Sequence, residues 1–120
     1  MAQVLGIGGV FVKAEDTAAL AAWYARVLGF ELQGYGGAMW PPPADGFTLW
    51  SPFAASTDYF APSASPFMLN LRVDDIDGMV DRVQAAGETI LGRSDESYGR
   101  FAWLLDPQGV KIELWEHLES

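Results

Sequence analysis

The sequence predicts an α+β protein in which two tandem βαβββ modules form a curved mixed sheet around a cleft. Signals for one strand, one helix and three strands occur twice along the chain. The two copies keep the same spacing, since Gly9 lies 7 residues before Asp16 and Met68 lies 7 residues before Asp75. Each copy also ends in a hairpin whose turn finishes with a glycine. An internal repeat of this kind indicates two similar structural units.

At 120 residues the chain has the length of one domain. We expect residues 1–50 to form the first module and residues 67–120 the second. Residues 51–66 connect them and are rich in serine, alanine and proline, but they are too few and too aromatic for a free linker. We therefore expect an ordered connector that lies over another part of the molecule.

In the first module, Val4–Lys13 is expected to form a strand, although Gly8 and Gly9 interrupt it. A helix follows over Thr17–Leu28, because Asp16 can cap its start and Gly29 can end it in the left-handed conformation. The remaining strands of this module are expected at Phe30–Gln33, Ala38–Trp40 and Phe47–Trp50.

In the second module, Phe67–Val73 is expected to form a strand and Ile76–Ala86 a helix that Asp75 caps. A short strand is expected at Glu88–Leu91. The last two strands, Arg100–Leu105 and Val110–Glu116, are joined by the sequence DPQG, which favours a type I turn followed by a left-handed glycine.

The register of this final hairpin follows from its turn. If Asp106 pairs with Val110, then Trp103 lies opposite Glu113 and Phe101 opposite Trp115. Because side chains alternate along a strand, one face is plain core and the other is aromatic with a carboxylate in its middle. The aromatic face carries Phe101, Trp103, Leu105, Lys111, Glu113 and Trp115.

A carboxylate in such surroundings needs a partner, since burying a bare charge is costly. We predict that Glu113 faces the cleft and has at least one side-chain donor within about 3.2 Å. The candidate donors are Arg72, Lys111, Asn70 and the indole N–H of Trp103.

Composition excludes several function classes. The net charge of −9 disfavours nucleic acid and anionic membranes as partners, since both require basic patches. The chain has no apolar run of about 18 residues, and its start, MAQVLGIGGVFVK, does not have the form of a signal peptide. The absence of cysteine excludes disulfides and thiolate metal sites and fits a cytoplasmic protein.

Three segments, WYARVLGF, LRVDDIDGMVDRVQAAG and LLDPQGVKIELWE, resemble the vicinal oxygen chelate superfamily. The superfamily includes glyoxalase I, extradiol dioxygenases, fosfomycin-resistance enzymes and bleomycin-binding proteins, and the resemblance covers nearly the whole chain. It implies a glyoxalase/bleomycin-resistance-like fold of paired βαβββ modules, a homodimer, and, in the enzymes, a divalent metal held in the cleft.

The resemblance also implies where such a metal would bind. Its ligand positions match Gly9, Thr48, Met68 and Glu113, and of these only the glutamate is a good ligand for the metals concerned. We therefore expect no cofactor and no metal. An atypical divalent metal site stays as an alternative.

The candidate ligand-binding residues combine rings with polar anchors. If strand alternation holds, Lys13, Arg72, Lys111 and Asn70 point toward the cleft, where they suit an anionic or polar ligand group. Their alternative role is to balance nearby acids at strand ends. The tryptophans Trp50, Trp103 and Trp115 suit an aromatic ligand, or else belong to the core or to a dimer interface. We expect His117 to be a solvated tail residue.

Three functions fit these predictions. The first is a metal-free dimeric binder of a small molecule, similar to bleomycin-binding proteins. The second is a lyase, isomerase or dioxygenase with an atypical metal site, in which Glu113 is the best catalytic candidate. The third is a structural or regulatory homodimer whose cleft is filled by side chains.

Overall fold

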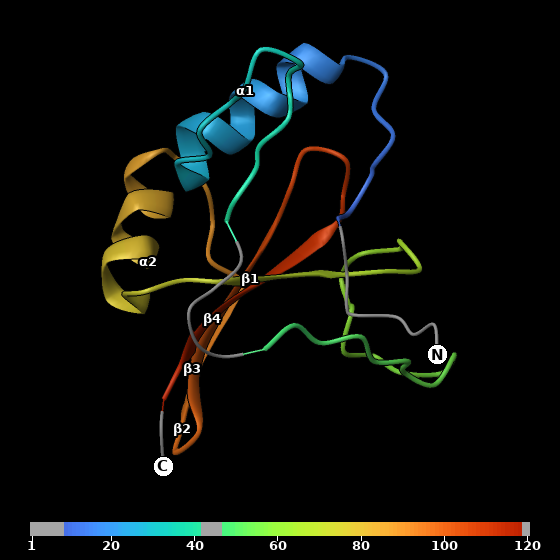
Figure 1. Cartoon of the computed structure of the whole chain (residues 1–120). Coiled ribbons are helices and arrows are strands. Elements are labelled where there is room, and N and C mark those ends of the chain that lie inside the picture. Colours follow the sequence, from blue (N-terminus) through green and yellow to red (C-terminus); the bar gives the residue numbers. More distant parts are fainter. Residues whose placement is uncertain (1–8, 42–46, 119–120) are drawn as a thin grey trace, which may run out of the picture.

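The structure is a computed structural model that describes residues 9–41 and 47–118. Its elements in chain order are α1 (Thr17–Leu28), β1 (Leu69–Arg72), α2 (Ile76–Ala85), β2 (Gly92–Glu96), β3 (Gly99–Leu105) and β4 (Lys111–His117). The strands form one curved mixed sheet in the order β1-β4-β3-β2, and both helices lie on the same side of it (Figure 1). The predicted α+β class and curved mixed sheet are therefore confirmed.

Both helices begin and end at the predicted signals. The side chain of Asp16 accepts a hydrogen bond from the Ala19 N–H at 3.0 Å, and that of Asp75 accepts one from the Gly78 N–H at 3.2 Å. Gly29 ends α1 with a φ of 77°, a left-handed conformation that favours glycine. Neither helix of the described chain is long and apolar enough to cross a membrane.

The final hairpin has the predicted register. Trp103 pairs with Glu113 and Phe101 with Trp115 in the antiparallel ladder between β3 and β4. The Asp106 N–H donates to the Val110 carbonyl at 2.9 Å, and Gly109 has a φ of 79°. Strand β1 lies on the other side of β4 and pairs with it in parallel.

The helices pack on the plain face of this hairpin. The side chains that are almost fully buried there come from all layers: Val27 of α1, Ile76 and Val83 of α2, Leu104 of β3, and Ile112 and Leu114 of β4. Burial of this apolar surface is the main stabilising contribution to the fold.

A buried hydrogen bond joins α1 to the hairpin turn. The Tyr24 hydroxyl donates to Asp106 Oδ2 at 2.6 Å, while Asp106 Oδ1 accepts from the N–H groups of Gln108 and Val110 at 2.8 and 3.0 Å. Burial, followed by the hydrogen bond to Asp106, raises the pKa of Tyr24 well above its ordinary value. Tyr24 is therefore a neutral donor at physiological pH.

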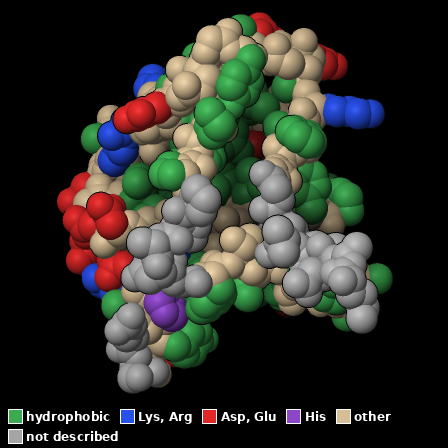
Figure 2. Space-filling view, in the orientation of Figure 1, with side chains coloured by type: hydrophobic (Ala, Val, Ile, Leu, Met, Phe, Trp, Pro, Cys, Tyr) green, Lys and Arg blue, Asp and Glu red, His purple; other side chains and the backbone are tan. Residues whose placement is uncertain are grey.

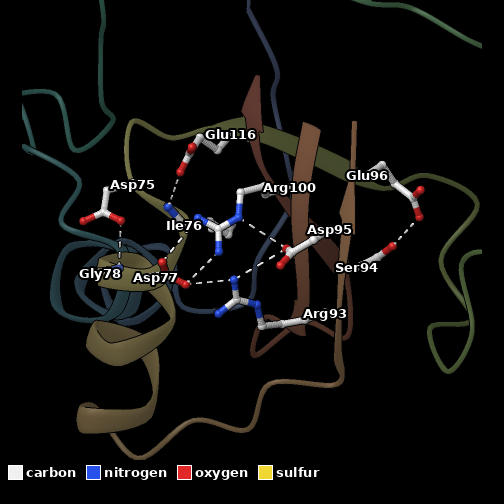
Figure 3. Close-up of polar contacts among 10 residues, drawn as sticks. All are labelled: Asp75, Ile76, Asp77, Gly78, Arg93, Ser94, Asp95, Glu96, Arg100 and Glu116. Carbon is white, nitrogen blue, oxygen red and sulfur yellow. Dashed lines mark hydrogen bonds and ion pairs between the residues drawn. The ribbon is translucent and has the colours of Figure 1, made fainter. Parts of the chain in front are cut away.

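Polar contacts also tie α2 to strands β2, β3 and β4 (Figure 3). Asp77, in the first turn of α2, forms ion pairs with Arg93 of β2 and Arg100 of β3 at 2.9 and 3.0 Å. The Ile76 N–H donates to Glu116 at 2.8 Å. In Figure 2, acidic side chains gather on the left of the molecule, and hydrophobic side chains are spread over the rest of the view.

The strands predicted for the first module are mostly not formed. Residues 9–13 and the segments 38–40 and 47–50 contain no strand, and the described part of the first module has one isolated bridge, between Leu32 and Ala38. A strand requires a backbone partner, and these apolar segments find little pairing within the described chain. The start of the predicted strand Val4–Lys13 lies outside the described residues, and the division into two modules stays a prediction.

The strand predicted at Glu88–Leu91 was placed too early. Gly87, with a φ of 89°, closes α2, and the Glu88 N–H still donates to the Val83 carbonyl of that helix. Pairing with β3 begins at Leu91 and continues through the polar strand β2. At the edge of a sheet, backbone pairing does not require apolar side chains, so the hydrophobic pattern missed this strand.

Candidate functional site

The aromatic face of the sheet is the side of β3 and β4 that points away from the helices. We use this name for the six alternating side chains Phe101, Trp103, Leu105, Lys111, Glu113 and Trp115. The rings of Phe101 and Trp103 lie nearly parallel, with centroids 6.2 Å apart. The sequence predicted this face because a tight turn fixes the hairpin register.

Glu113 is the polar centre of the aromatic face. The residue is only 8% exposed. Oε1 accepts from Asn70 Nδ2 at 2.7 Å, and Oε2 accepts from Trp103 Nε1 at 2.8 Å and from the Tyr59 hydroxyl. The predicted side-chain donor to Glu113 is therefore confirmed, with Asn70 and Trp103 both among the predicted candidates.

The third donor, Tyr59, comes from the connector, residues 51–66. Figure 1 shows this segment, in green, on the side of the sheet away from α1 and α2. Lys111 Nζ donates to the Tyr59 carbonyl at 2.6 Å and lies 5.2 Å from the centre of the Tyr59 ring. Ser63 Oγ donates to the Gly109 carbonyl, which anchors the connector to the hairpin turn. The expectation that the connector lies over another part of the molecule is confirmed.

Sequence reasoning did not find Tyr59. The connector has no periodic pattern from which the direction of a side chain could be predicted, and its aromatic content was the one available signal. In the structure the Tyr59 ring stacks on Phe53 at 5.5 Å and meets Trp103 edge to face at 6.2 Å. Contact between the aromatic rings of the connector and those of the sheet thus helps to hold the connector in position.

Electrostatics keep the Tyr59 hydroxyl protonated. Burial raises the pKa of Tyr59 most, and the hydrogen bond to the Glu113 carboxylate raises it further. A neutral phenol beside an ionised carboxylate forms a charge-assisted hydrogen bond, which is stronger than one between neutral groups. Lys111, also buried, adds a positive charge 5.7 Å from the Trp103 ring.

Arg72 and Trp115 are two more of the predicted residues. They lie on the same side of the sheet as Asn70 and Glu113, two residues further along β1 and β4. Arg72 pairs in register with Trp115, as Asn70 does with Glu113. The Trp115 ring packs against Phe47 at 5.5 Å. Parallel register therefore brings Asn70, Arg72, Glu113 and Trp115 to one surface.

The other two predicted ligand-binding residues, Lys13 and Trp50, belong to the first half of the chain. Lys13 lines a separate pocket of about 340 Å³ at the hairpin turn, beside Phe11, Leu20 and Asp106. Trp50 is 77% exposed.

His117 is not a solvated tail residue, and that expectation is wrong. It is the last residue of β4, and its ring meets those of Trp115 and Phe47 at 5.4 and 5.5 Å. Its Nδ1 and the Nε1 of Trp115 are buried without a hydrogen-bond partner in the described structure. Strand β4 runs one residue further than predicted, which carries this histidine onto the aromatic side.

Among the described residues, the four positions that match the superfamily's metal ligands do not come together as a metal site. Gly9 and Thr48 lie in exposed segments without strand structure, and Met68 directly precedes β1. Both oxygens of Glu113 are met by N–H or O–H donors, which would have to give way to a metal ion. Within residues 9–41 and 47–118, no three His, Cys, Asp or Glu side chains form a group that could hold a metal ion.

The chain matches a known protein family. The model of the glyoxalase-like domain family matches residues 9–115. No curated protein matches the sequence.

Several solved structures are similar. TnmS3, an antibiotic binding protein from Streptomyces sp. CB03234, is 27% identical with a TM-score of 0.58, over 89% of this chain and 91% of that one. TioX from Micromonospora sp. ML1 is 20% identical with a TM-score of 0.54, over 89% and 92%. A glyoxalase/bleomycin resistance protein/dioxygenase family enzyme from Burkholderia phytofirmans PsJN is 21% identical with a TM-score of 0.53, over 88% and 93%.

The similarity to TioX and to the Burkholderia phytofirmans enzyme shows only a shared fold. The family match is independent of them and spans most of the chain, including both helices, strands β1 to β3, and β4 as far as Trp115. The chain therefore belongs to the glyoxalase-like domain family, within the vicinal oxygen chelate superfamily.

Proposed function

We propose that this chain is a bleomycin-resistance-like protein that binds a small molecule on the aromatic face of its sheet, as a homodimer and without a metal ion. The observation that carries the proposal is Glu113, a buried carboxylate that meets three side-chain donors among aromatic rings. Small-molecule sites combine apolar walls with a few placed polar groups. The similarity to TnmS3, an antibiotic binding protein, supports this proposal.

The chemistry of the aromatic face limits the ligand. Stacked rings favour an aromatic compound. Lys111 and Arg72 place positive charge on the same side of the sheet, which favours a ligand with an anionic or electron-rich oxygen.

A thermal-shift screen of antibiotics and aromatic metabolites tests the proposal. A ligand at about 100 times its Kd stabilises the folded state by about 2.7 kcal/mol. With an unfolding entropy of about 2.1 cal/mol/K per residue, this raises the Tm by about 10 °C. If no member of a broad library raises the Tm, the proposal is contradicted.

Exposed apolar surface supports the homodimer. Phe11 is 99% exposed, and Met39, Trp40, Leu49 and Trp50 are all more than half exposed. The chain has an accessible surface of 8487 Å², whereas a compact monomer of 13.1 kDa is expected to have about 6,400 Å². Its radius of gyration of 15.0 Å also exceeds the value of about 13.6 Å expected for a compact chain of this length.

The proposed occupant of this surface is a second copy of the chain, because the segments 9–13, 38–40 and 47–50 have strand-like sequences and little pairing. Light scattering at micromolar concentration should give twice the chain mass of 13.1 kDa. A Trp50→Glu variant should shift that mass toward the monomer, whereas Tyr98→Glu, exposed at the tip of the β2–β3 hairpin, should not. A wild-type mass of 13.1 kDa contradicts the dimer.

The metal-free state is the other part of the proposal, and its basis is the replacement of ligating side chains at Gly9, Thr48 and Met68. Elemental analysis of the purified protein should find no stoichiometric Zn, Ni, Mn or Fe. One tightly held ion per chain would favour instead an enzyme of the glyoxalase or dioxygenase type.

The absence of cysteine supports placing the protein in the cytoplasm.

A further inference from the structure

The connector places a phenol on the buried carboxylate of the aromatic face. The Tyr59 hydroxyl donates to Glu113 Oε2, its ring stacks on Phe53 at 5.5 Å, and Trp103 meets its edge at 6.2 Å. Lys111 lies 5.2 Å from the ring centre. The Glu113 carboxylate, the rings of Phe53 and Trp103, and the Lys111 ammonium group thus surround the phenol ring of Tyr59.

The segment that carries this ring is held by side-chain and turn contacts rather than by regular secondary structure. The connector contains no helix or strand, and Tyr59 is 36% exposed. Besides the ring contacts, hydrogen bonds hold the connector on both sides of Tyr59. Lys111 donates to the Tyr59 carbonyl, the Tyr59 N–H to Thr57 Oγ1 at 3.1 Å, the Ala61 N–H to the Asp58 carbonyl at 3.0 Å, and Ser63 Oγ to the Gly109 carbonyl. Segments with partial exposure and few buried contacts open at low free-energy cost.

Glu113, in contrast, is fixed in the sheet. If Tyr59 leaves, Oε2 keeps Trp103 Nε1 but loses its O–H donor, and Lys111 loses the carbonyl that it binds. A buried carboxylate that loses a donor is destabilised. The entering molecule must therefore supply a donor to Glu113, an aromatic ring to the walls and an acceptor to Lys111.

We propose that Tyr59 occupies the position of the ligand's phenol group, so that the protein binds hydroxylated aromatic compounds that displace Tyr59 from Glu113. This inference rests on the proposed function and narrows its ligand to phenols, in particular phenols that also carry a carbonyl or carboxylate oxygen within reach of Lys111. The connector acts as an internal competitor that covers the carboxylate in the free protein.

The test is to remove the competitor and to supply its side chain as a free compound. The probe is 4-methylphenol, the side chain of tyrosine, and its matched control is 4-methylanisole, which has no donor. Calorimetry compares the wild type, Tyr59→Ala and Tyr35→Ala; Tyr35 is an exposed tyrosine of the turn after α1, so its variant controls for the loss of any tyrosine ring.

We expect Tyr59→Ala to bind 4-methylphenol at least about tenfold more tightly than the wild type or Tyr35→Ala does. It should also prefer 4-methylphenol to 4-methylanisole by at least about tenfold, since a hydrogen bond to a charged group contributes that much. Adding Glu113→Gln should reduce this preference. Equal affinity for the two compounds, or equal affinity of Tyr59→Ala and the wild type for 4-methylphenol, overturns the inference.

If Tyr59→Ala does not fold, Tyr59→Phe serves instead. It keeps the ring but no longer donates to Glu113, so 4-methylphenol should bind it more tightly than it binds the wild type, and unchanged affinity overturns the inference.

The screen on the wild type separates this inference from the proposed function. A wild type that binds no library compound contradicts the proposed function, whereas selection of 4-methylphenol by Tyr59→Ala would still support the phenol position assigned to Tyr59. A wild type that binds compounds without a hydroxyl, with no selection by Tyr59→Ala, contradicts only this inference.

Discussion

Replacing Tyr24 by phenylalanine tests how α1 is joined to the sheet. The substitution removes one hydroxyl, whose hydrogen bond to Asp106 Oδ2 is 2.6 Å long. The ring stays in place, because it packs against Trp23 and Phe30 with centroids 5.0 and 4.9 Å apart. Any change in stability therefore reports on the hydrogen bond.

The magnitude follows from burial. Tyr24 and Asp106 are both buried, so water cannot replace the missing donor. A hydrogen bond to a charged group contributes about 1.5–3 kcal/mol. We expect a loss of about 2 kcal/mol in the free energy of unfolding. With an unfolding entropy of about 2.1 cal/mol/K per residue, the Tm should fall by about 8 °C.

Urea unfolding followed by circular dichroism measures the loss, and thermal unfolding checks it. Tyr35→Phe is the control, because Tyr35 is exposed and its variant should stay within about 0.5 kcal/mol of the wild type. A Tyr24→Phe protein as stable as the Tyr35→Phe protein would refute the argument that this hydrogen bond stabilises the fold.

Three further predictions concern stability. Above about pH 10 the unfolded chain loses the Tyr24 proton while the folded chain keeps it, because burial raises the pKa of Tyr24; stability should then fall with rising pH, by at most about 1.4 kcal/mol per pH unit from this residue, and less steeply in Tyr24→Phe. Leu104→Ala, at a fully buried position, should lower the free energy of unfolding by about 3 kcal/mol in urea, and a loss below about 1 kcal/mol would contradict the packing described. Asp77→Asn should destabilise the protein in low salt, and the difference should shrink in about 1 M NaCl if the ion pairs with Arg93 and Arg100 are its cause.

The sequence predicted best where structure is set locally. Asp16, Asp75 and Gly29 mark helix ends through contacts with near neighbours, and all three act as expected. The turn DPQG fixed the hairpin register, and with it the opposition of Trp103 and Glu113. Asn70 was a candidate donor by strand alternation, and the parallel pairing of β1 with β4 brings it to the carboxylate.

The errors arose where partners far apart in the sequence decide the structure. Strand β2 is polar and forms only because β3 offers its edge, so no hydrophobic pattern marks it. Tyr59 reaches Glu113 across 54 positions, from a segment without periodicity. The strand-like segments of the first half depend on a backbone partner, and composition alone cannot state whether the chain itself provides one.

The central claim is that Glu113 serves ligand binding more than folding. Glutamine at this position can keep an oxygen toward Trp103 and Tyr59 and turn its amide toward Asn70, whose own amide can rotate to accept. The direct measurement is to compare Glu113→Gln with the wild type in calorimetric affinity for a ligand found by screening and in urea unfolding. We predict affinity at least about tenfold weaker, with a loss of unfolding free energy below about 1 kcal/mol. Unchanged affinity, or a loss of stability larger than the loss of binding free energy, would contradict the claim.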